Sequence, residues 1–308
     1  MMKDKKIIFM GTPLLATEYL DALINNNIKV STVFTQPPKK KSRGMKISKS
    51  PVHILAEQNE IDILCPNEFD YKTTNDLIKQ QPDLIVVMAY GKILPKEILE
   101  IPKYGCINIH VSLLPRWRGA APLEHTLMSG DIQTGITIIK LKEKLDAGPI
   151  IVQEKFIIPE RFNKLQLSNS LTLIGTKLLV ETIPKIFNNE ITLQDQNEDY
   201  ATYAGKITSE DRKINFGNST KNIINQIRAH APKPGAWFHL NKERIIIIDA
   251  KPGFEKGAKS TILNSNFEIG CQDGSILPLL LQREGKKVVS IDDFLRGFKT
   301  KIHDVINA

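Results

Sequence analysis

The chain has 308 residues, of which 41% are hydrophobic and 25% are charged, as is typical of a soluble globular protein with ample mass for a buried core. It carries 42 Lys and Arg against 34 Asp and Glu, so its formal net charge is +8 at pH 7. This charge is compatible with an anionic partner but does not identify one. Neither an internal repeat nor a heptad pattern is evident, which excludes solenoid and coiled-coil architectures.

Cys65, Cys106 and Cys271 are isolated and show no Cys-x-x-Cys spacing. This pattern predicts reduced thiols and argues against a disulfide or zinc scaffold. The apolar run in MMKDKKIIFMG soon reaches Gly11 and Pro13, so it is too short for a signal-peptide core or a membrane span. We therefore expect a cytoplasmic protein with no membrane partner.

Strands and helices are predicted to alternate along the first two hundred residues. The expected strands cover 6–10, 28–35, 61–64, 83–89, 106–111, 135–141 and 150–157, and the expected helices cover 14–26, 51–59, 73–80, 123–129 and 165–187. The segment DLIVVMA at 83–89 is the near-continuous apolar run of a buried parallel strand. This alternation predicts an α/β fold with a doubly wound, mostly parallel sheet of Rossmann-like type.

The first strand-to-helix turn has the sequence MGTPLLA. It lacks the glycine spacing G-x-G-x-x-G that a dinucleotide-binding turn needs for close approach of the pyrophosphate. No Walker sequence is present either. We therefore expect neither NAD nor FAD.

A cationic segment, QPPKKKSRGMKISKS, lies between the second expected strand and the helix at 51–59. Its six cations, with no acid among them, are Lys39, Lys40, Lys41, Arg43, Lys46 and Lys49. Such a run is usually a solvated loop. However, the carboxyl ends of strands carry the ligands in open α/β sheets. A cationic loop there would contact phosphates and steer a nucleic acid.

The stretch CINIHVSLLPRWRGAAP at 106–122 carries the strongest chemical signal. It begins with strand alternation, in which Asn108 and His110 lie two residues apart and therefore face the same side. The prolines and glycine that follow end the strand in a loop. Arg116 and Arg118 flank Trp117 in this loop, where they can bind an anion, stack on the ring or brace the loop.

This pair of side chains suits acyl transfer. A histidine can take a proton from an amine near neutral pH, and an asparagine amide can donate a hydrogen bond to a developing oxyanion. Asp146, in KLDAGPI, can orient the histidine or hold a water. Taken alone, Asn108 would be interpreted as a loop cap, His110 as a polar residue with satisfied hydrogen bonds, and Asp146 as a turn residue. Together they favour a catalytic site.

The pattern changes after residue 188. The polar segment 188–202 has little to bury and is interpreted as a linker. Beyond a helix expected at 220–229, short β-rich runs are separated by Gly, Asn and Asp turns, at 244–249, 260–263, 268–271 and 276–282. We predict a small antiparallel barrel, with Trp237 as a core anchor. The expected domains are 1–188, a linker at 189–206, and 207–308, where 16 Lys and Arg face 11 Asp and Glu.

Eight motifs follow one another along the chain: IIFMGTP, VFTQP, SPV, VVMAYGKILP, INIHVSLLPRWRGAAP, QTGITI, LDAGPI and YAGKIT. In this order they resemble the methionyl-tRNA formyltransferase family. The resemblance implies transfer of a formyl group from 10-formyltetrahydrofolate to the α-amino group of methionyl initiator tRNA, without a metal. It implies catalytic roles for Asn108, His110 and Asp146, and it makes the C-terminal domain an OB-like, tRNA-binding barrel.

The resemblance also assigns binding residues. The folate-contacting segment falls on Ser112, Leu113, Leu114 and Pro115, and the tRNA-acceptor-stem loop falls on the cationic segment, with Arg43 at the family's arginine. Lys206 either touches tRNA or is a solvated linker lysine. We expect a monomer. The chain departs from the family pattern at Val111, at 160–164 and at Ser42, which affects local pocket shape.

Two alternatives stay open at this point. The central motif alone also fits a folate-dependent formyltransferase or hydrolase that acts on a small amine or on water. A tRNA-binding module with a decayed catalytic site is the second alternative. The cationic segment favours an RNA-linked acceptor, and the intact Asn108, His110 and Asp146 argue against the decayed module.

Overall fold

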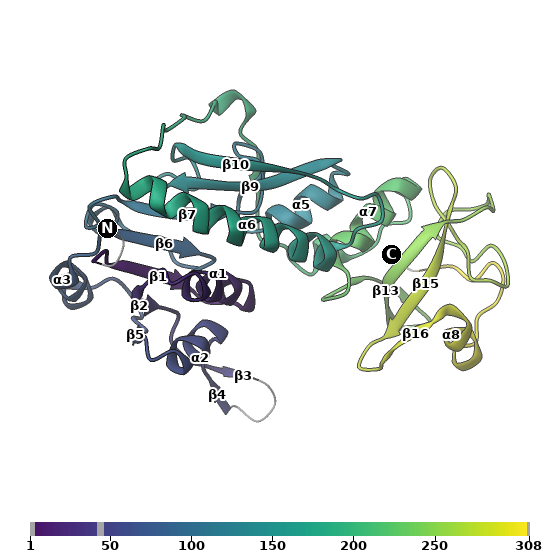
Figure 1. Ribbon diagram of the computed structural model, residues 1–308. Helices are drawn as coiled ribbons and strands as arrows, with labels where there is room; N and C mark the ends of the chain where they lie inside the picture. The colour runs from purple at the N-terminus through teal and green to yellow at the C-terminus, as the bar shows by residue number, and fades with distance from the viewer. Residues whose placement is uncertain (1–3, 42–45, 307–308) are drawn as a thin grey trace. The chain divides into compact units, whose positions relative to one another are not determined.

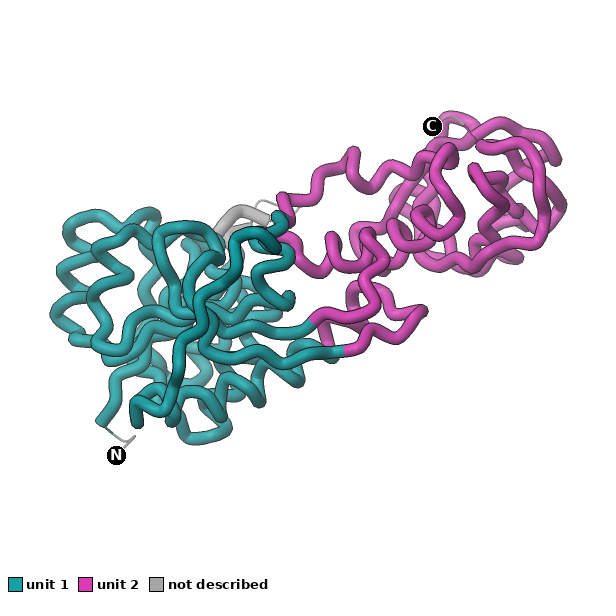
Figure 2. The backbone as a smooth tube through the Cα atoms, turned by 90° about the horizontal axis from the view of Figure 1, so that it is seen from above, with its two compact units in different colours: residues 1–118, 135–156, 170–203 teal, residues 119–134, 157–169, 204–308 magenta. Residues whose placement is uncertain are grey.

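The computed structural model describes residues 4–41 and 46–306, and for 39–41 and 46–47 it describes the backbone alone. The chain divides into two compact units (Figure 2). The first contains residues 1–118, 135–156 and 170–203, and the second contains 119–134, 157–169 and 204–308. The expected division into 1–188, 189–206 and 207–308 stays a prediction.

A seven-stranded sheet forms the centre of the first unit, with the strand order β10-β9-β7-β6-β1-β2-β5 (Figure 1). The strands are β1 (Ile7–Gly11), β2 (Val30–Phe34), β5 (Asp62–Leu64), β6 (Leu84–Met88), β7 (Cys106–His110), β9 (Gln133–Lys140) and β10 (Ile150–Ile157). The first five pair in parallel, whereas β9 runs antiparallel to β7. The carboxyl ends of β1, β6 and β7 therefore meet at one edge.

Helices cover both faces of this sheet. As a result, every residue of β1 and β6 is buried, and all of these residues are apolar. The helices are α1 (Leu14–Asn25), α2 (Pro51–Gln58), α3 (Tyr71–Gln80), α4 (Lys96–Leu99) and α6 (Lys164–Phe187). Leu77 of α3 and Ile98 of α4 pack against alternate residues of β1 and β6 on one face. The other face carries α1 and α6, and Tyr19 of α1 lies against Gly175 of α6 (Figure 1).

The second unit contains an antiparallel sheet of β12 (Ala236–Leu240), β13 (Glu243–Pro252), β14 (Ile269–Gly270), β15 (Ser275–Arg283) and β16 (Val288–Ser290). Its helices are α5 (Pro122–Met128), α7 (Thr220–His230) and α8 (Ile291–Gly297). Five phenylalanines lie in its core: Phe216, Phe238, Phe267, Phe294 and Phe298. Trp237 is buried as well. The predicted fold, a doubly wound α/β sheet followed by an antiparallel barrel-type domain, is confirmed.

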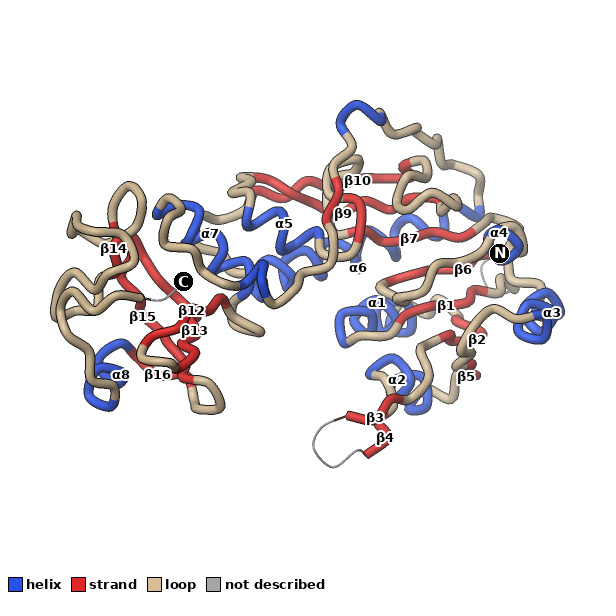
Figure 3. The backbone as a smooth tube through the Cα atoms, turned by 180° about the vertical axis from the view of Figure 1, so that it is seen from behind, coloured by secondary structure: helices blue, strands red, loops and turns tan. Residues whose placement is uncertain are grey.

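Several short elements complete the chain (Figure 3). They are β3 (Lys39–Lys41), β4 (Lys46–Ser48), β8 (Arg118–Gly119), β11 (Tyr203–Ala204) and the 3₁₀ turns Glu198–Tyr200 and Glu210–Arg212. The strand expected at 260–263 is wrong: Thr261 and Ile262 make isolated bridges only. Ser260 has a φ of +60°, and this left-handed residue interrupts the extended backbone that a strand requires.

Within residues 4–41 and 46–306, no helix is long and apolar enough to cross a membrane.

Candidate active site

Asn108 and His110 lie at the carboxyl end of β7. Asn108 lies opposite Val87 of β6 and Ile139 of β9, and His110 lies opposite Thr137 of β9. The side chain of His110 is almost completely buried, whereas Asn108 keeps part of its surface exposed. The strand alternation predicted from the sequence therefore brings both side chains to the same face.

The imidazole of His110 has a polar neighbour at each nitrogen. Its Nε2 atom lies 2.8 Å from the main-chain oxygen of Trp117. Since a carbonyl oxygen only accepts, Nε2 carries the hydrogen and donates it. The lone pair of the neutral ring is therefore on Nδ1, which lies 3.6 Å from Oδ2 of Asp146. A proton taken up at Nδ1 would face this carboxylate, so the structure brings the predicted base and its partner together.

Asp146 lies in a tight turn between β9 and β10. Its backbone has a φ of +49°, a left-handed conformation that Asp adopts more readily than most residues do. Two residues later, a methyl group on Gly148 would overlap the main-chain oxygen of Lys140. The turn therefore depends on a glycine at this position, and its backbone holds the carboxylate of Asp146 in a site where only 8% of the residue is exposed.

Thr137 and Gln153 shape the loop that follows β7. The Thr137 hydroxyl donates to the main-chain oxygen of Ser112 at 2.6 Å and accepts from the main-chain nitrogen of Leu114 at 3.1 Å. The Gln153 amide donates to the main-chain oxygen of Leu114 at 2.8 Å. The side chains of Ser112 and Leu114 are buried, whereas Leu113 and Pro115 are half-buried. Of the four predicted folate contacts, Leu113 and Pro115 thus offer side-chain surface.

Residues 194–202, which we call the strap, run back from the end of α6 along β10 and then reach the loop after β7 (Figure 1). Gln194 pairs with Ile150 of β10. Thr202 accepts hydrogen bonds from the main-chain nitrogens of Trp117 and Arg118, at 2.9 and 2.8 Å. The strap is part of the segment that its polar composition had assigned to a linker. The composition of this segment did not indicate that it packs against the site, because the strap is held mainly by hydrogen bonds and buries little apolar surface.

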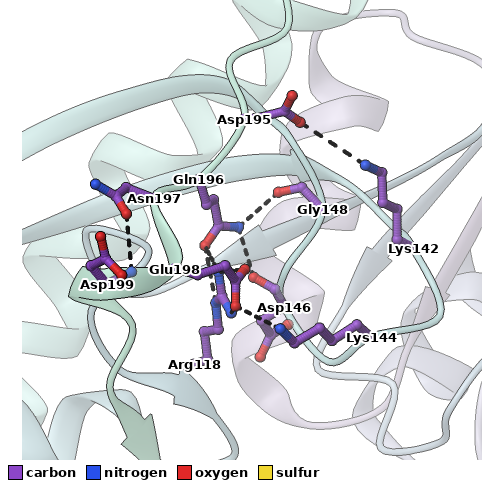
Figure 4. Close-up of polar contacts among 10 residues, drawn as sticks. All are labelled: Arg118, Lys142, Lys144, Asp146, Gly148, Asp195, Gln196, Asn197, Glu198 and Asp199. Carbon is purple, nitrogen blue, oxygen red and sulfur yellow. Dashed lines mark hydrogen bonds and ion pairs between the residues drawn. The ribbon is translucent and has the colours of Figure 1, made fainter.

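Arg118 anchors the middle of the strap (Figure 4). Its side chain is fully buried and donates to Gln196 Oε1 and to both carboxylate oxygens of Glu198. Hydrogen bonds from Arg118 and Lys144 lower the pKa of Glu198 to about 2. Among the roles considered for the two arginines, Arg118 braces the loop, while Arg116 lies over the Trp117 ring at 4.2 Å.

The predicted tRNA contacts are only partly described. Lys39, Lys40 and Lys41 lie on β3 and Lys46 on β4, two strands that pair antiparallel. Arg43 lies outside the described residues. Lys49 is exposed and lies 2.5 Å from Glu57 of α2, whose pKa the lysine lowers. Lys206 is exposed.

Three other histidines have surroundings of their own. His53 contacts Glu57 at 3.3 Å, His125 lies 3.2 Å from the main-chain oxygen of Gly205, and His230 is fully buried. Within the described part of the chain, no group of three or more His, Cys, Asp or Glu residues is arranged to hold a metal ion.

Two protein-family models match this chain, one in each half. Residues 5–183 match the formyl transferase model, and residues 206–299 match the model of the formyl transferase C-terminal domain. Curated relatives called methionyl-tRNA formyltransferase are similar over nearly their whole length. The one from Wolbachia sp. subsp. Drosophila simulans is 41% identical over 96% of this chain and 98% of its own. The one from Rickettsia bellii is 41% identical with the same coverage.

Solved structures share the fold at lower identity. An N-formyltransferase from Helicobacter canadensis, in complex with folinic acid and dTDP-3-aminofucose, superposes with a TM-score of 0.69 at 23% identity, over 91% of this chain and 99% of its own. A methionyl-tRNA formyltransferase from Clostridium thermocellum superposes with a TM-score of 0.56 at 19% identity, over 81% of this chain and 94% of its own.

Proposed function

The chain belongs to the methionyl-tRNA formyltransferase family, and we propose that it transfers the formyl group of 10-formyltetrahydrofolate to the α-amino group of methionyl initiator tRNA. The product is N-formylmethionyl-tRNA, used to initiate translation. The observation that carries the chemistry is the pair formed by His110 and Asp146, whose Nδ1 and Oδ2 atoms are 3.6 Å apart beside Asn108.

His110 acts as the general base. The α-amino group of an aminoacyl ester must lose its proton to attack, and the reference pKa of an α-amine is about 7.7–8.0, so little activation is needed beyond deprotonation and positioning. Nδ1 is the available basic atom because Nε2 is engaged with Trp117. Asp146 stabilises the imidazolium that forms, either directly or through a relaying water. His110 then returns the proton towards the departing nitrogen.

Asn108 stabilises the negative charge that develops on the formyl oxygen. Its amide lies on the same face of β7 as His110 and is partly exposed, which lets it meet a bound substrate. The folate supplies the formyl carbon. Its ring system would contact the half-buried side chains of Leu113 and Pro115, which offer apolar surface to a flat heterocycle.

The proposed tRNA contacts are Lys39, Lys40, Lys41, Arg43, Lys46, Lys49 and Lys206. Lysine ammonium groups bind phosphates as point charges, so these contacts would position the acceptor stem, while Arg43 is the candidate for reading its terminal pair. The excess of Lys and Arg after residue 206 gives the second unit the charge needed to bind the same RNA. We further propose that the protein acts in the cytoplasm as a monomer.

A smaller acceptor is the competing proposal. The solved neighbours that act on amino sugars share this fold, but at 23% identity or less they carry no argument about the acceptor. The cationic segment of this chain favours an RNA-linked amine over a sugar or water. The decayed-module alternative is disfavoured by the His110–Asp146 geometry.

Formyl-labelled 10-formyltetrahydrofolate tests the proposal. The purified protein is incubated with this donor and methionyl initiator tRNA, and the label is followed after the aminoacyl ester is hydrolysed. Label recovered in N-formylmethionine supports the proposal. Label recovered only as free formate supports a hydrolase, and tRNA binding without folate turnover supports a binding module.

A further inference from the structure

The side chain of Gln196 ties the strap to the turn that carries Asp146. Its Nε2 atom donates to the main-chain oxygen of Asp146 at 2.8 Å and to that of Gly148 at 2.7 Å. Figure 4 shows this amide between Arg118 and the turn. One side chain of the strap thus holds both ends of the three-residue segment Asp146–Gly148.

Arg118 fixes which way this amide points. Its Nε and a terminal nitrogen both donate to Gln196 Oε1, at 3.1 and 2.8 Å. A guanidinium has donors only, so it accepts the oxygen side of the amide and rejects the NH₂ side. The NH₂ group must therefore face the turn, where two carbonyl oxygens accept its two hydrogens. All four hydrogen bonds agree with a single orientation.

The turn needs such a restraint. A residue held at positive φ, as Asp146 is, adopts a sparsely populated backbone conformation, which persists when the surrounding contacts enforce it. The carboxylate of Asp146 must also lie at a defined place beside Nδ1 of His110. A displacement of about 1 Å at a catalytic group can reduce the rate by about 10²-fold.

We propose that Gln196, with its amide orientation set by Arg118, is a positioning residue that holds the Asp146–Gly148 turn so that Asp146 faces His110. This inference rests on the proposed function, in which Asp146 acts with His110. Gln196 acts through the main chain of the turn, by its bonds to the oxygens of Asp146 and Gly148.

Gln196→Glu is the most specific variant. It keeps an oxygen for Arg118 but replaces the donating NH₂ by an acceptor that opposes both carbonyl oxygens of the turn. Gln196→Met removes both sets of bonds. Asp195→Asn is the matched control, since Asp195 is the neighbouring strap residue, its side chain is 90% exposed, and its contact with Lys142 is a long 4.0 Å ion pair.

Formyl transfer is measured for these variants in the wild-type and Asp146→Asn backgrounds. We expect Gln196→Glu to lower kcat by about 10–100-fold with KM for both substrates nearly unchanged, and to add less than about twofold to the loss already caused by Asp146→Asn. Asp195→Asn should leave kcat unchanged. An equal loss from Gln196→Glu in both backgrounds, or a change confined to KM, would overturn the positioning role.

Hydrogen exchange gives a readout that does not depend on the reaction. Exchange of the main-chain amides at 141–148 should be faster in Gln196→Glu and Gln196→Met than in the wild type and in Asp195→Asn. Unchanged exchange in both Gln196 variants would contradict the restraint. Should the wild-type protein make no formylmethionyl-tRNA, the proposed function would fail, while the exchange measurement would still decide whether Gln196 holds the turn.

Discussion

Nδ1 of His110 lies 3.6 Å from Oδ2 of Asp146, and both residues are more than nine-tenths buried. Because Nε2 of the same ring donates to a main-chain oxygen, the proton that His110 takes up is located at Nδ1. In the proposed mechanism, the carboxylate stabilises the imidazolium at the atom where the charge forms. We therefore expect His110 and Asp146 to act as a unit in general-base catalysis.

Replacing His110 by alanine should reduce kcat for formyl transfer by about 10²–10⁴-fold, the usual contribution of a positioned base. Asp146→Asn should lower kcat too, and the double variant should be little worse than His110→Ala alone, because the two groups serve one proton transfer. Steady-state kinetics on the three variants provide the measurement. Strictly additive losses would contradict the assignment.

Asn108→Ala should reduce kcat by about 10²–10³-fold, as removal of a single oxyanion donor typically does. The KM values for the folate and for the tRNA should change little, since the donated hydrogen bond strengthens as charge develops. Near-normal turnover in this variant would reject the oxyanion role of Asn108.

Gly148→Ala should destabilise the protein by about 1–3 kcal/mol, because the added methyl group would overlap the main-chain oxygen of Lys140. Displacement of the turn should also lower kcat, since Asp146 lies in the same turn, two residues before Gly148. Gly297→Ala is the matched control, because a methyl group there would meet nothing within 4 Å. Equal midpoints of denaturant unfolding for the two variants would show that the close approach is unimportant.

Replacing Lys40 by alanine should weaken tRNA binding and lower the slope of log Kd against log salt by about 1, the effect of one lost phosphate contact. Lys49→Ala should change the slope less, because Lys49 already pairs with Glu57. The control is Lys177→Ala on α6, whose side chain is 78% exposed. If Lys40→Ala and Lys177→Ala gave the same slope, the role of the cationic segment would be refuted.

The stability of the second unit should fall on mild acidification because of His230. Burial lowers the pKa of this histidine to about 4, below the value of about 6.5 expected when unfolded. The unfolded chain therefore binds a proton that the folded chain does not, and stability present above about pH 6.5 is lost as the pH falls towards 4. Between about pH 7 and 5 the loss should be about 2 kcal/mol.

Denaturant unfolding monitored through Trp237, which lies in the second unit, measures this effect. A His230→Phe variant should have a flatter pH dependence over the same range, even if its overall stability is lower. If the free energy of unfolding depended on pH equally in both proteins, His230 would not be the source of the acid sensitivity.

Much of the fold could be predicted from the sequence because its signals are local. The apolar run at 83–89 identifies β6, and the alternation at 106–111 identifies β7. The ends of both strands agree with the prediction to within one residue. The sequence analysis missed several elements, among them α4, α8 and β12, and two of the missed strands depend on distant partners. β8 and β11 contain two residues each and pair with one another across about 85 positions of sequence, so neither carries a periodic pattern of its own.

The candidate site could be predicted as far as the three side chains that we propose to be catalytic. Asn108 and His110 follow from strand alternation, and Asp146 was identified from its loop. The supporting residues could not be found in this way. Thr137 faces the loop from β9, and Gln196 acts from a polar segment where composition indicates solvent. The sequence offered one indication of these supporting contacts, namely Arg118, which lies between a tryptophan and a glycine. Bracing of the loop was one of the three roles considered for this arginine.

The acceptor and the role of His110 can be measured together by single-turnover formyl transfer to methionylated initiator tRNA, methionylated elongator tRNA and an amino sugar nucleotide. We expect the wild-type protein to formylate the initiator tRNA rapidly and the other two acceptors little, and His110→Ala to formylate the initiator tRNA slowly. Formylation of the sugar at a comparable rate would refute the tRNA acceptor, and undiminished transfer by His110→Ala would refute the general base.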